Sequence, residues 1–153
     1  MKRVLLGNYK GTELSWIPIY KNINDRNVLI LEKPICKMPY DSGINHYRNS
    51  DIRKFIVDDF VPNSFSDDEL SLLVPNKEVF GDLAWLAGYF EVNSLTKNSL
   101  KIFKEKSGWW MRGHSEANNL KSVTAGVFWF GGLNGEVAKD WNEGVRPCIE
   151  VKC

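Results

Sequence analysis

The order of periodic patterns along the chain constrains its fold more than any other feature of the sequence. In the first third, the alternating residues 14–20 and the apolar, β-branched run 28–31 predict two strands. The polar residues 22–27 between them predict a hairpin loop. We therefore expect the fold to begin with paired strands.

Helix signals fill the middle third. Residues 50–60 combine a Ser-Asp cap with apolar residues that recur on one helical face, and Pro62 is expected to end this helix. Residues 66–69 read Ser-Asp-Asp-Glu, the pattern of a capping box, and predict a second, short helix. The apolar spacing of residues 82–90 predicts a third helical stretch.

The last third returns to short strands joined by glycine-rich loops, at residues 108–114, 123–130 and 144–147. Because strands come first, helices second and strands again last, the sequence predicts an α+β fold and not an alternating βαβ fold. A length of 153 residues is usual for one domain, and no repeat or linker divides the chain. We therefore expect a single domain over residues 1–153.

The charge balance limits the classes of partner. The chain has 20 basic and 19 acidic side chains, and its formal charge is +1. Binding of duplex nucleic acid requires a basic face, so no nucleic acid partner is expected. The lysine-rich residues 97–106 are interrupted by Glu105 and predict a solvated face. No Cys/His pair has zinc spacing and no carboxylates have calcium spacing, so no metal or other cofactor is expected.

The cysteines and the absence of targeting patterns bear on the compartment. Cys36, Cys148 and Cys153 are odd in number and form no CxxC motif, unlike the cysteines of a secreted disulfide scaffold. The N-terminal residues are too polar for a secretion signal, and no run approaches the roughly 20 apolar residues of a membrane span. We therefore expect free thiols, a cytoplasmic location and no membrane association.

Motifs of common catalytic sites are missing from the sequence. It has no Gly-x-Ser-x-Gly elbow, no P-loop, no His-Glu-x-x-His and no dinucleotide-binding glycine pattern. The two histidines, His46 and His114, have no Cys or Asp beside them in a recognisable pattern, so a satisfied polar role is favoured over a general base. We expect no enzymatic activity and name no catalytic residue.

A Trp-Trp-Met-Arg run and a Gly-Val-Arg-Pro run stand out in the last third. Adjacent residues on a strand point to opposite faces, so one of the two Trp should join the core and the other should face a loop or solvent. The arginines can pair with carboxylates or stack on an indole. We favour a structural role for all four of these residues: Trp109, Trp110, Arg112 and Arg146.

With these motifs the chain resembles a bacterial and phage domain family of unknown function. That family is lectin-like in fold and related to the formylglycine-generating-enzyme type of C-type lectin domain. Five pieces match in the family's order: residues 7–16, residues 28–33, residues 47–55 with Phe60 and 63–69, residues 109–112, and residues 144–147. Gly113 replaces a common Ser, residues 78–103 match poorly, and the cysteines are not placed as in sulfatase-activating members. The resemblance therefore implies the fold and not the catalysis.

The resemblance also implies where ligands bind. In related lectin-like modules, ligands contact the irregular surface between the Trp-Trp-x-Arg strand and the final Arg-Pro strand, which here means the segment 114–143. Trp129 belongs either to a core strand or, as we favour, to the face opposite Phe128 and Phe130, and Trp141 is the better candidate for exposure. The expected partner-binding residues are His114, Asn118, Asn119, Lys121, Trp129, Asn134, Lys139, Asp140 and Trp141.

The sequence is compatible with three functions. The first is a non-catalytic module that binds a macromolecule, in our interpretation a protein; its size and the resemblance are compatible with a phage-encoded inhibitor or regulator of a host system. The second is a carbohydrate- or small-ligand-binding domain, against which the missing calcium ligands weigh. The third is a degenerate formylglycine-type enzyme that uses Cys148, but a buried cysteine is the favoured interpretation there.

Overall fold

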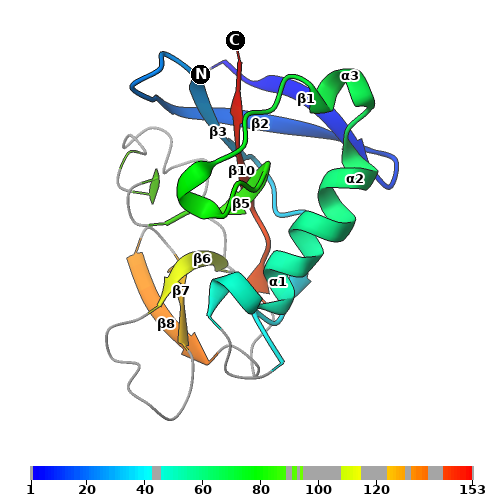
Figure 1. The fold of residues 1–153 in the computed structure, drawn as a ribbon. Helices are drawn as coiled ribbons and strands as arrows, with labels where there is room; N and C mark the ends of the chain where they lie inside the picture. Colours follow the sequence, from blue (N-terminus) through cyan, green and yellow to red (C-terminus); the bar gives the residue numbers. More distant parts are fainter. Residues whose placement is uncertain are drawn as a thin grey trace.

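The computed structural model describes residues 2–42, 46–88, 91, 92, 94, 108–114, 124–129, 132–137 and 143–152. Within these residues, the chain forms two five-stranded sheets and a group of short helices (Figure 1). The architecture is α+β, as the sequence predicted. Among the described residues, no helix has the length and apolar character needed to cross a bilayer.

The first sheet contains strands from both ends of the sequence. Its strands are antiparallel throughout, in the order β1 (Val4–Tyr9), β2 (Thr12–Lys21), β3 (Asn27–Leu31), β10 (Pro147–Val151) and β5 (Ala84–Leu86). Because β10 pairs with β3, the N- and C-terminal ends lie at the same end of the molecule (Figure 1).

The β2–β3 hairpin is the predicted one. The side-chain oxygen of Asn22 accepts hydrogen bonds from the backbone N–H groups of Asn24 and Arg26, at 3.0 and 3.1 Å. Asp25 adopts a left-handed conformation, with φ 57°, which Asp tolerates better than most residues. Local side-chain chemistry thus forms the loop that the polar run predicted.

The second sheet contains most of the glycine-rich last third. Its order is β4 (Lys37–Met38), β9 (Glu143–Gly144), β6 (Trp109–His114), β7 (Thr124–Trp129) and β8 (Gly132–Val137). All pairs are antiparallel except β6 with β9. The predicted strands over 108–114 and 123–130 are confirmed as β6 and β7.

The longest helical segment begins where the sequence predicted but ends later. The elements η1 (Tyr47–Asn49), α1 (Asp51–Lys54), η2 (Phe55–Phe60) and α2 (Val61–Ser64) follow one another, and the Ser50 hydroxyl caps α1 by accepting from the N–H of Arg53. The prediction that Pro62 ends this helix was wrong. The preceding turn η2 is π-helical, with the N–H of Val61 donating to Ile56, so Pro62 falls in the first turn of α2, where its missing N–H costs least.

The capping box at residues 66–69 is confirmed. The Ser66 hydroxyl accepts from the N–H of Glu69 at 3.2 Å, and the Glu69 carboxylate accepts from the N–H of Ser66 at 3.0 Å. This box starts α3 (Asp67–Leu70). The other Glu69 oxygen accepts from the N–H of Gly7 at 2.9 Å, so the box also attaches the helical segment to β1.

The prediction of a helix over residues 82–90 is wrong for residues 82–88, the part of this stretch that the structure describes. A short 3₁₀ turn, η3 (Lys77–Val79), precedes this stretch, and Ala84–Leu86 forms strand β5, which pairs with β10. All three residues of β5 are buried. Pairing with the distant C-terminal strand decides the conformation here, over the helical spacing of the apolar residues.

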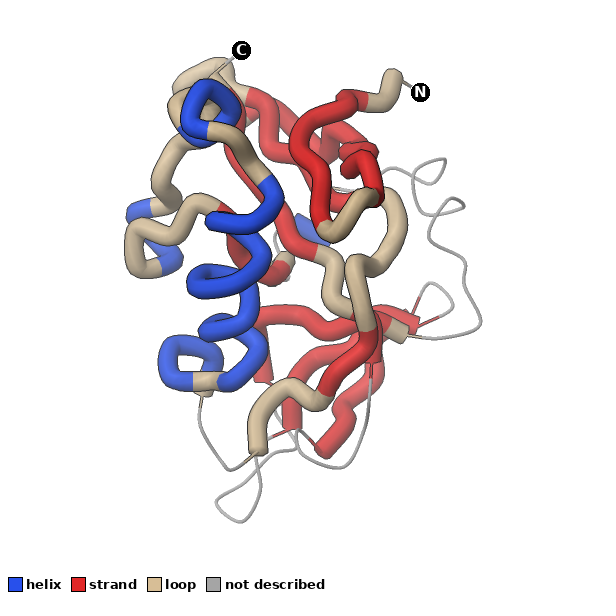
Figure 2. The backbone as a smooth tube through the Cα atoms, turned by 90° about the vertical axis from the view of Figure 1, so that its right-hand side faces the viewer, coloured by secondary structure: helices blue, strands red, loops and turns tan. Residues whose placement is uncertain are grey.

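The register of the first sheet separates its two faces. Residues paired across strands share a face, and alternate residues of one strand do too. One face carries Trp16, Leu29, Leu31, Ala84 and Ile149. Trp16 stacks on Phe65 beyond α2, at 6.3 Å between ring centroids, so the helical segment covers this face (Figure 2). The opposite face carries Tyr20, Val28, Trp85, Cys148 and Glu150.

Candidate binding sites

The segment 114–143, predicted to bind a partner, is only partly covered by the described residues. The backbone of His114, Trp129 and Asn134 is placed on β6, β7 and β8, where these residues pair with Ala125, Gly132 and Val127. The remaining predicted binding residues lie outside the described part of the chain: Asn118, Asn119, Lys121, Lys139, Asp140 and Trp141.

The strand that leads into this segment and the strand that follows it pair with each other at buried residues. Trp109 of β6 pairs with Gly144 of β9, and the N–H of Gly144 donates to the carbonyl of Gly108 at 3.1 Å. A Cβ atom on Gly144 would lie 3.0 Å from the Pro34 ring, so this close approach favours glycine. Beyond Gly144 the chain leaves the second sheet, because Pro147 begins β10 of the first sheet.

The adjacent tryptophans on β6 are both fully buried, so neither faces solvent. The Trp110 indole N–H donates to the carbonyl of Met38 at 2.8 Å, and its ring packs edge-on against Tyr40 at 5.5 Å. The guanidinium of Arg146 lies 5.2 Å from the Trp109 ring centroid and donates to the carbonyl of Glu32 at 3.0 Å. Arg146 thus stacks on an indole and ties the closing segment to the loop after β3.

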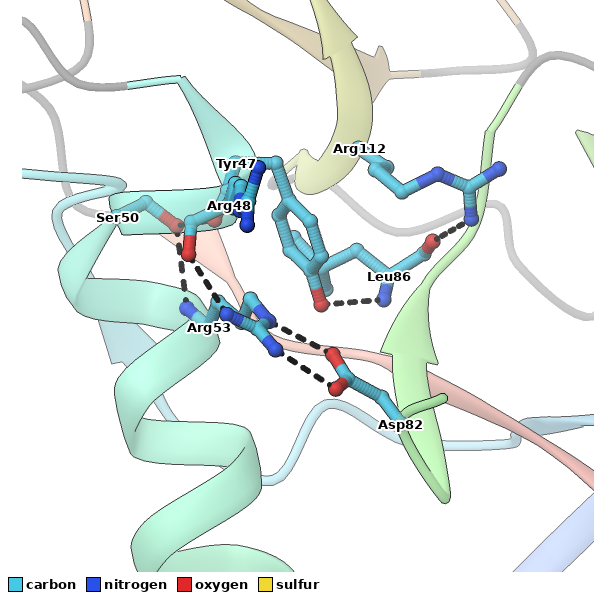
Figure 3. A network of polar contacts seen from close by, with 7 residues as sticks. All are labelled: Tyr47, Arg48, Ser50, Arg53, Asp82, Leu86 and Arg112. Atoms are coloured by element: carbon cyan, nitrogen blue, oxygen red, sulfur yellow. Dashed lines mark hydrogen bonds and ion pairs between the residues drawn. The ribbon is translucent and has the colours of Figure 1, made fainter. Parts of the chain in front are cut away.

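Arg112 connects β6 with the end of β5. Its guanidinium donates to the carbonyl of Leu86 at 2.9 Å (Figure 3) and lies 3.6 Å from the Glu91 carboxylate. Its backbone N–H donates to the carbonyl of Ala87 at 2.8 Å. A Cβ atom on Gly88 would lie 2.8 Å from the Arg112 guanidinium, so the absence of a side chain there leaves room for it.

Strand β5 is also fixed from the helical side. The Leu86 N–H donates to the Tyr47 hydroxyl at 3.2 Å, and Arg53 donates two hydrogen bonds of 2.8 Å to the Asp82 carboxylate (Figure 3). These contacts hold both ends of the strand on which Trp85 is the central residue. Trp85 therefore has a fixed position on the face of the first sheet opposite Trp16, which contacts the helical segment.

On that face lies a cavity of about 770 Å³, which we call the Trp85 cavity. Its size is in the range of small-molecule sites, roughly 300–1,000 Å³. The described residues that line it include two aromatic rings, two buried carboxylates and one arginine: Tyr20, Trp85, Glu91, Glu150 and Arg112. Sequence reasoning missed this site. One feature of the sequence could have indicated it: Glu150 is the single charged residue in the otherwise apolar strand 147–151.

The two buried carboxylates have different surroundings. Glu91 accepts from the N–H of Gly88 at 3.0 Å and lies beside Arg112. Glu150, only 8% exposed, accepts from the Asn22 side-chain amide. Loss of water contact raises the pKa of Glu150, and Arg26 offsets part of this rise. Burial, followed by the negative charge of Glu91, raises the pKa of Tyr20 to about 12.

The described cysteines differ in exposure. Cys148 is fully buried between β3 and β5, and burial raises the pKa of its thiol well above the ordinary value. The expectation of a buried Cys148 is therefore confirmed. Cys36 is half-buried, lines a second cavity of about 590 Å³ with Tyr9 and Phe55, and also has a pKa raised by burial.

No group of three metal-ligating side chains that could hold an ion is found within the described residues. Comparison of the chain with protein-family models, with curated proteins and with solved structures finds no match. The function of the chain is therefore inferred from its residues and their geometry.

Proposed function

We propose that this chain is a non-catalytic binding module that recognises a protein partner through the segment 114–143. The observation that carries the proposal is the Trp109–Gly144 pairing, which places the strand that leads into the segment beside the strand that follows it. The residues around this pairing are at most 1% exposed, namely Trp109, Trp110, Met111, Val145 and Arg146. A long connection that starts and ends on such a base has the arrangement in which proteins present binding loops.

The strand order of the second sheet supports a macromolecular partner. Among the described strands, β8 is the last of its sheet and pairs only with β7. No described strand pairs with its outer backbone groups, and pairing of a further strand at such an edge is a common way to bind an extended peptide.

We further propose a lectin-like fold of the formylglycine-generating-enzyme type, without the enzymatic activity. The α+β element order and the meeting of the Trp-Trp-Met-Arg strand with the closing segment support this proposal. The buried Cys148 argues against a thiolate nucleophile at that position. Free Cys36 and Cys148 fit a reducing cytoplasm, in which a phage-encoded inhibitor or regulator of a host system would act.

The test is affinity capture from the lysate of a candidate host, with the Trp141→Ala variant beside the original chain. Leu5→Ser is the matched control, because Leu5 is a large apolar side chain, 62% exposed, on β1 of the other sheet. We expect Trp141→Ala to reduce recovery of the partner at least tenfold, the loss of one hot spot of roughly 1.4 kcal/mol or more. Leu5→Ser should retain it. Undiminished capture by folded Trp141→Ala would remove this segment from the proposal.

A second candidate function, binding of a carbohydrate or another small ligand, is favoured by the Trp85 cavity. Its lining includes the amide side chains of Asn22, Asn24 and Asn76 beside the aromatic rings, a combination that suits a polar small molecule. A glycan array with and without EDTA separates the two functions. Reproducible glycan binding that the Trp141→Ala variant retains would place this second function first.

A further inference from the structure

None of the residues described within 114–143 lines the Trp85 cavity. Its floor is one face of the first sheet: Trp85 pairs with Cys148, Glu150 pairs with Val28, and Val28 pairs with Tyr20. The two rings and the Glu150 carboxylate therefore belong to one continuous surface, although they are far apart in the sequence.

We propose that the Trp85 cavity binds an organic cation, an ammonium or guanidinium group, with the Glu150 carboxylate as the opposing charge and the Tyr20 and Trp85 rings as walls. This inference goes beyond the proposed protein-binding function.

The carboxylate of Glu150 points to a cationic ligand. More than nine tenths of this residue is buried, yet within the described part of the chain it accepts a hydrogen bond from Asn22 and forms no ion pair. A buried carboxylate without a cation costs free energy, whereas Glu91 in the same cavity already has Arg112. A cationic ligand would supply the charge that Glu150 lacks.

The other cationic side chains that line the cavity form no ion pair with Glu150. Lys21 pairs with Asp25 at 3.4 Å, on side chains that are 59% and 85% exposed. Lys77 is exposed and lies next to the exposed carboxylate of Glu78. Arg26 is half-buried and lowers the pKa of Glu150 through space, but no ion pair joins the two. Among the described residues, Glu150 is thus the buried carboxylate of the lining that has no ion pair.

The aromatic rings of the lining also favour a cation. A cation over the face of Tyr or Trp gains roughly 0.5–2 kcal/mol, the more so where water is excluded. Trp85 is 2% exposed, and its indole N–H has no hydrogen-bond partner among the described residues. A free amine and a Lys or Arg side chain of another protein offer the same cationic chemistry.

The test is titration of the isotope-labelled chain by NMR, following the Trp85 indole resonance, which its loss in Trp85→Phe identifies. The probes are n-butylamine and n-butylguanidine, with neutral n-butanol as control. A second arm uses acetylated, amidated Gly-Lys-Gly and Gly-Arg-Gly, with Gly-norleucine-Gly as control. Saturable binding of a cationic probe in either arm, at least fivefold tighter than its neutral control, supports the site, and the tighter arm identifies the source of the cation.

Two matched variants test the role of Glu150. Glu150→Gln retains the shape and removes the charge, and we expect it to weaken binding of the cation at least tenfold. Glu78→Gln removes an exposed carboxylate of the same cavity and should change the affinity less than threefold. Should Glu150→Gln fail to fold, Tyr20→Leu should weaken binding of the cation and not of n-butanol.

Equal binding of cations and neutral probes, or no binding in either arm, would overturn the proposal. So would an unchanged affinity in folded Glu150→Gln. The proposed protein-binding function is tested separately, because Trp141→Ala should leave binding of the cation unchanged and Glu150→Gln should leave partner capture unchanged.

Discussion

The contact between the helical segment and β5 allows a quantitative prediction. Asp82 is 5% exposed and accepts two hydrogen bonds of 2.8 Å from Arg53, which is 24% exposed. Replacement of Asp82 by Ala removes both bonds but leaves the backbone bonds of residue 82, which link it to Asn76 and Val79. Because β5 is held by this pair, the loss should lower the stability of the whole fold.

The hydrogen bonds of Asp82 set the size of the expected loss in the free energy of unfolding. A hydrogen bond to a charged group contributes roughly 1.5–3 kcal/mol, so two would give at most about 6 kcal/mol. Arg53 keeps contact with water, with the Arg48 carbonyl at 2.8 Å and with the Phe80 ring at 4.8 Å, which reduces the cost. We expect Asp82→Ala to lower the free energy of unfolding by about 3 kcal/mol and Tm by roughly 6–12 °C.

The assay is urea unfolding of the original chain, Asp82→Ala, Arg53→Met and the double variant. A double-mutant cycle should give a coupling of about 2 kcal/mol between residues 53 and 82. Asp68→Ala, at an exposed acidic residue of α3, should cost less than about 1 kcal/mol. A coupling below about 0.5 kcal/mol, with all variants folded, would refute the view that this ion pair fixes β5.

Two further predictions concern titration and thiol reactivity. Hydrogen bonds from the N–H groups of Ser66 and Gly7 lower the pKa of Glu69, so its contribution to stability is present above its unfolded pKa and is lost as the pH falls through the folded pKa. Unfolding free energies from pH 6 down to 3 should therefore fall less steeply for Glu69→Gln, and identical slopes would contradict this. Native protein should react with a maleimide at Cys36 and not at Cys148, which should react only after unfolding, as measured by mass spectrometry of peptides. Labelling of native Cys148 would show that β10 is not packed as described.

Local chemistry explains what the sequence predicted well. The side chain of Asn22 forms the hairpin loop, and the Ser66–Glu69 box starts α3, so neighbouring residues contain all the necessary information. The apolar, β-branched run 28–31 likewise forms a buried strand, because such residues suit a strand that has a neighbouring strand on each side.

Long-range contacts explain what it did not predict. The stretch 82–90 has helical spacing, but pairing with β10, more than sixty residues later, makes its centre a strand. Pro62 was expected to end a helix, and a π-helical turn before it allowed the helix to continue. The Trp85 cavity combines residues 20, 85, 91, 112 and 150, and no local pattern joins them. Sequence reasoning therefore missed the cavity, and its prediction of a binding segment over 114–143 stays a prediction.

The most direct test of the binding proposal is hydrogen–deuterium exchange of the chain alone and with its captured partner. The account predicts that the partner slows exchange within residues 114–143 and leaves the strands of the first sheet unchanged. Protection confined to β1, β2 or the helical segment, with 114–143 exchanging as in the free chain, would contradict it.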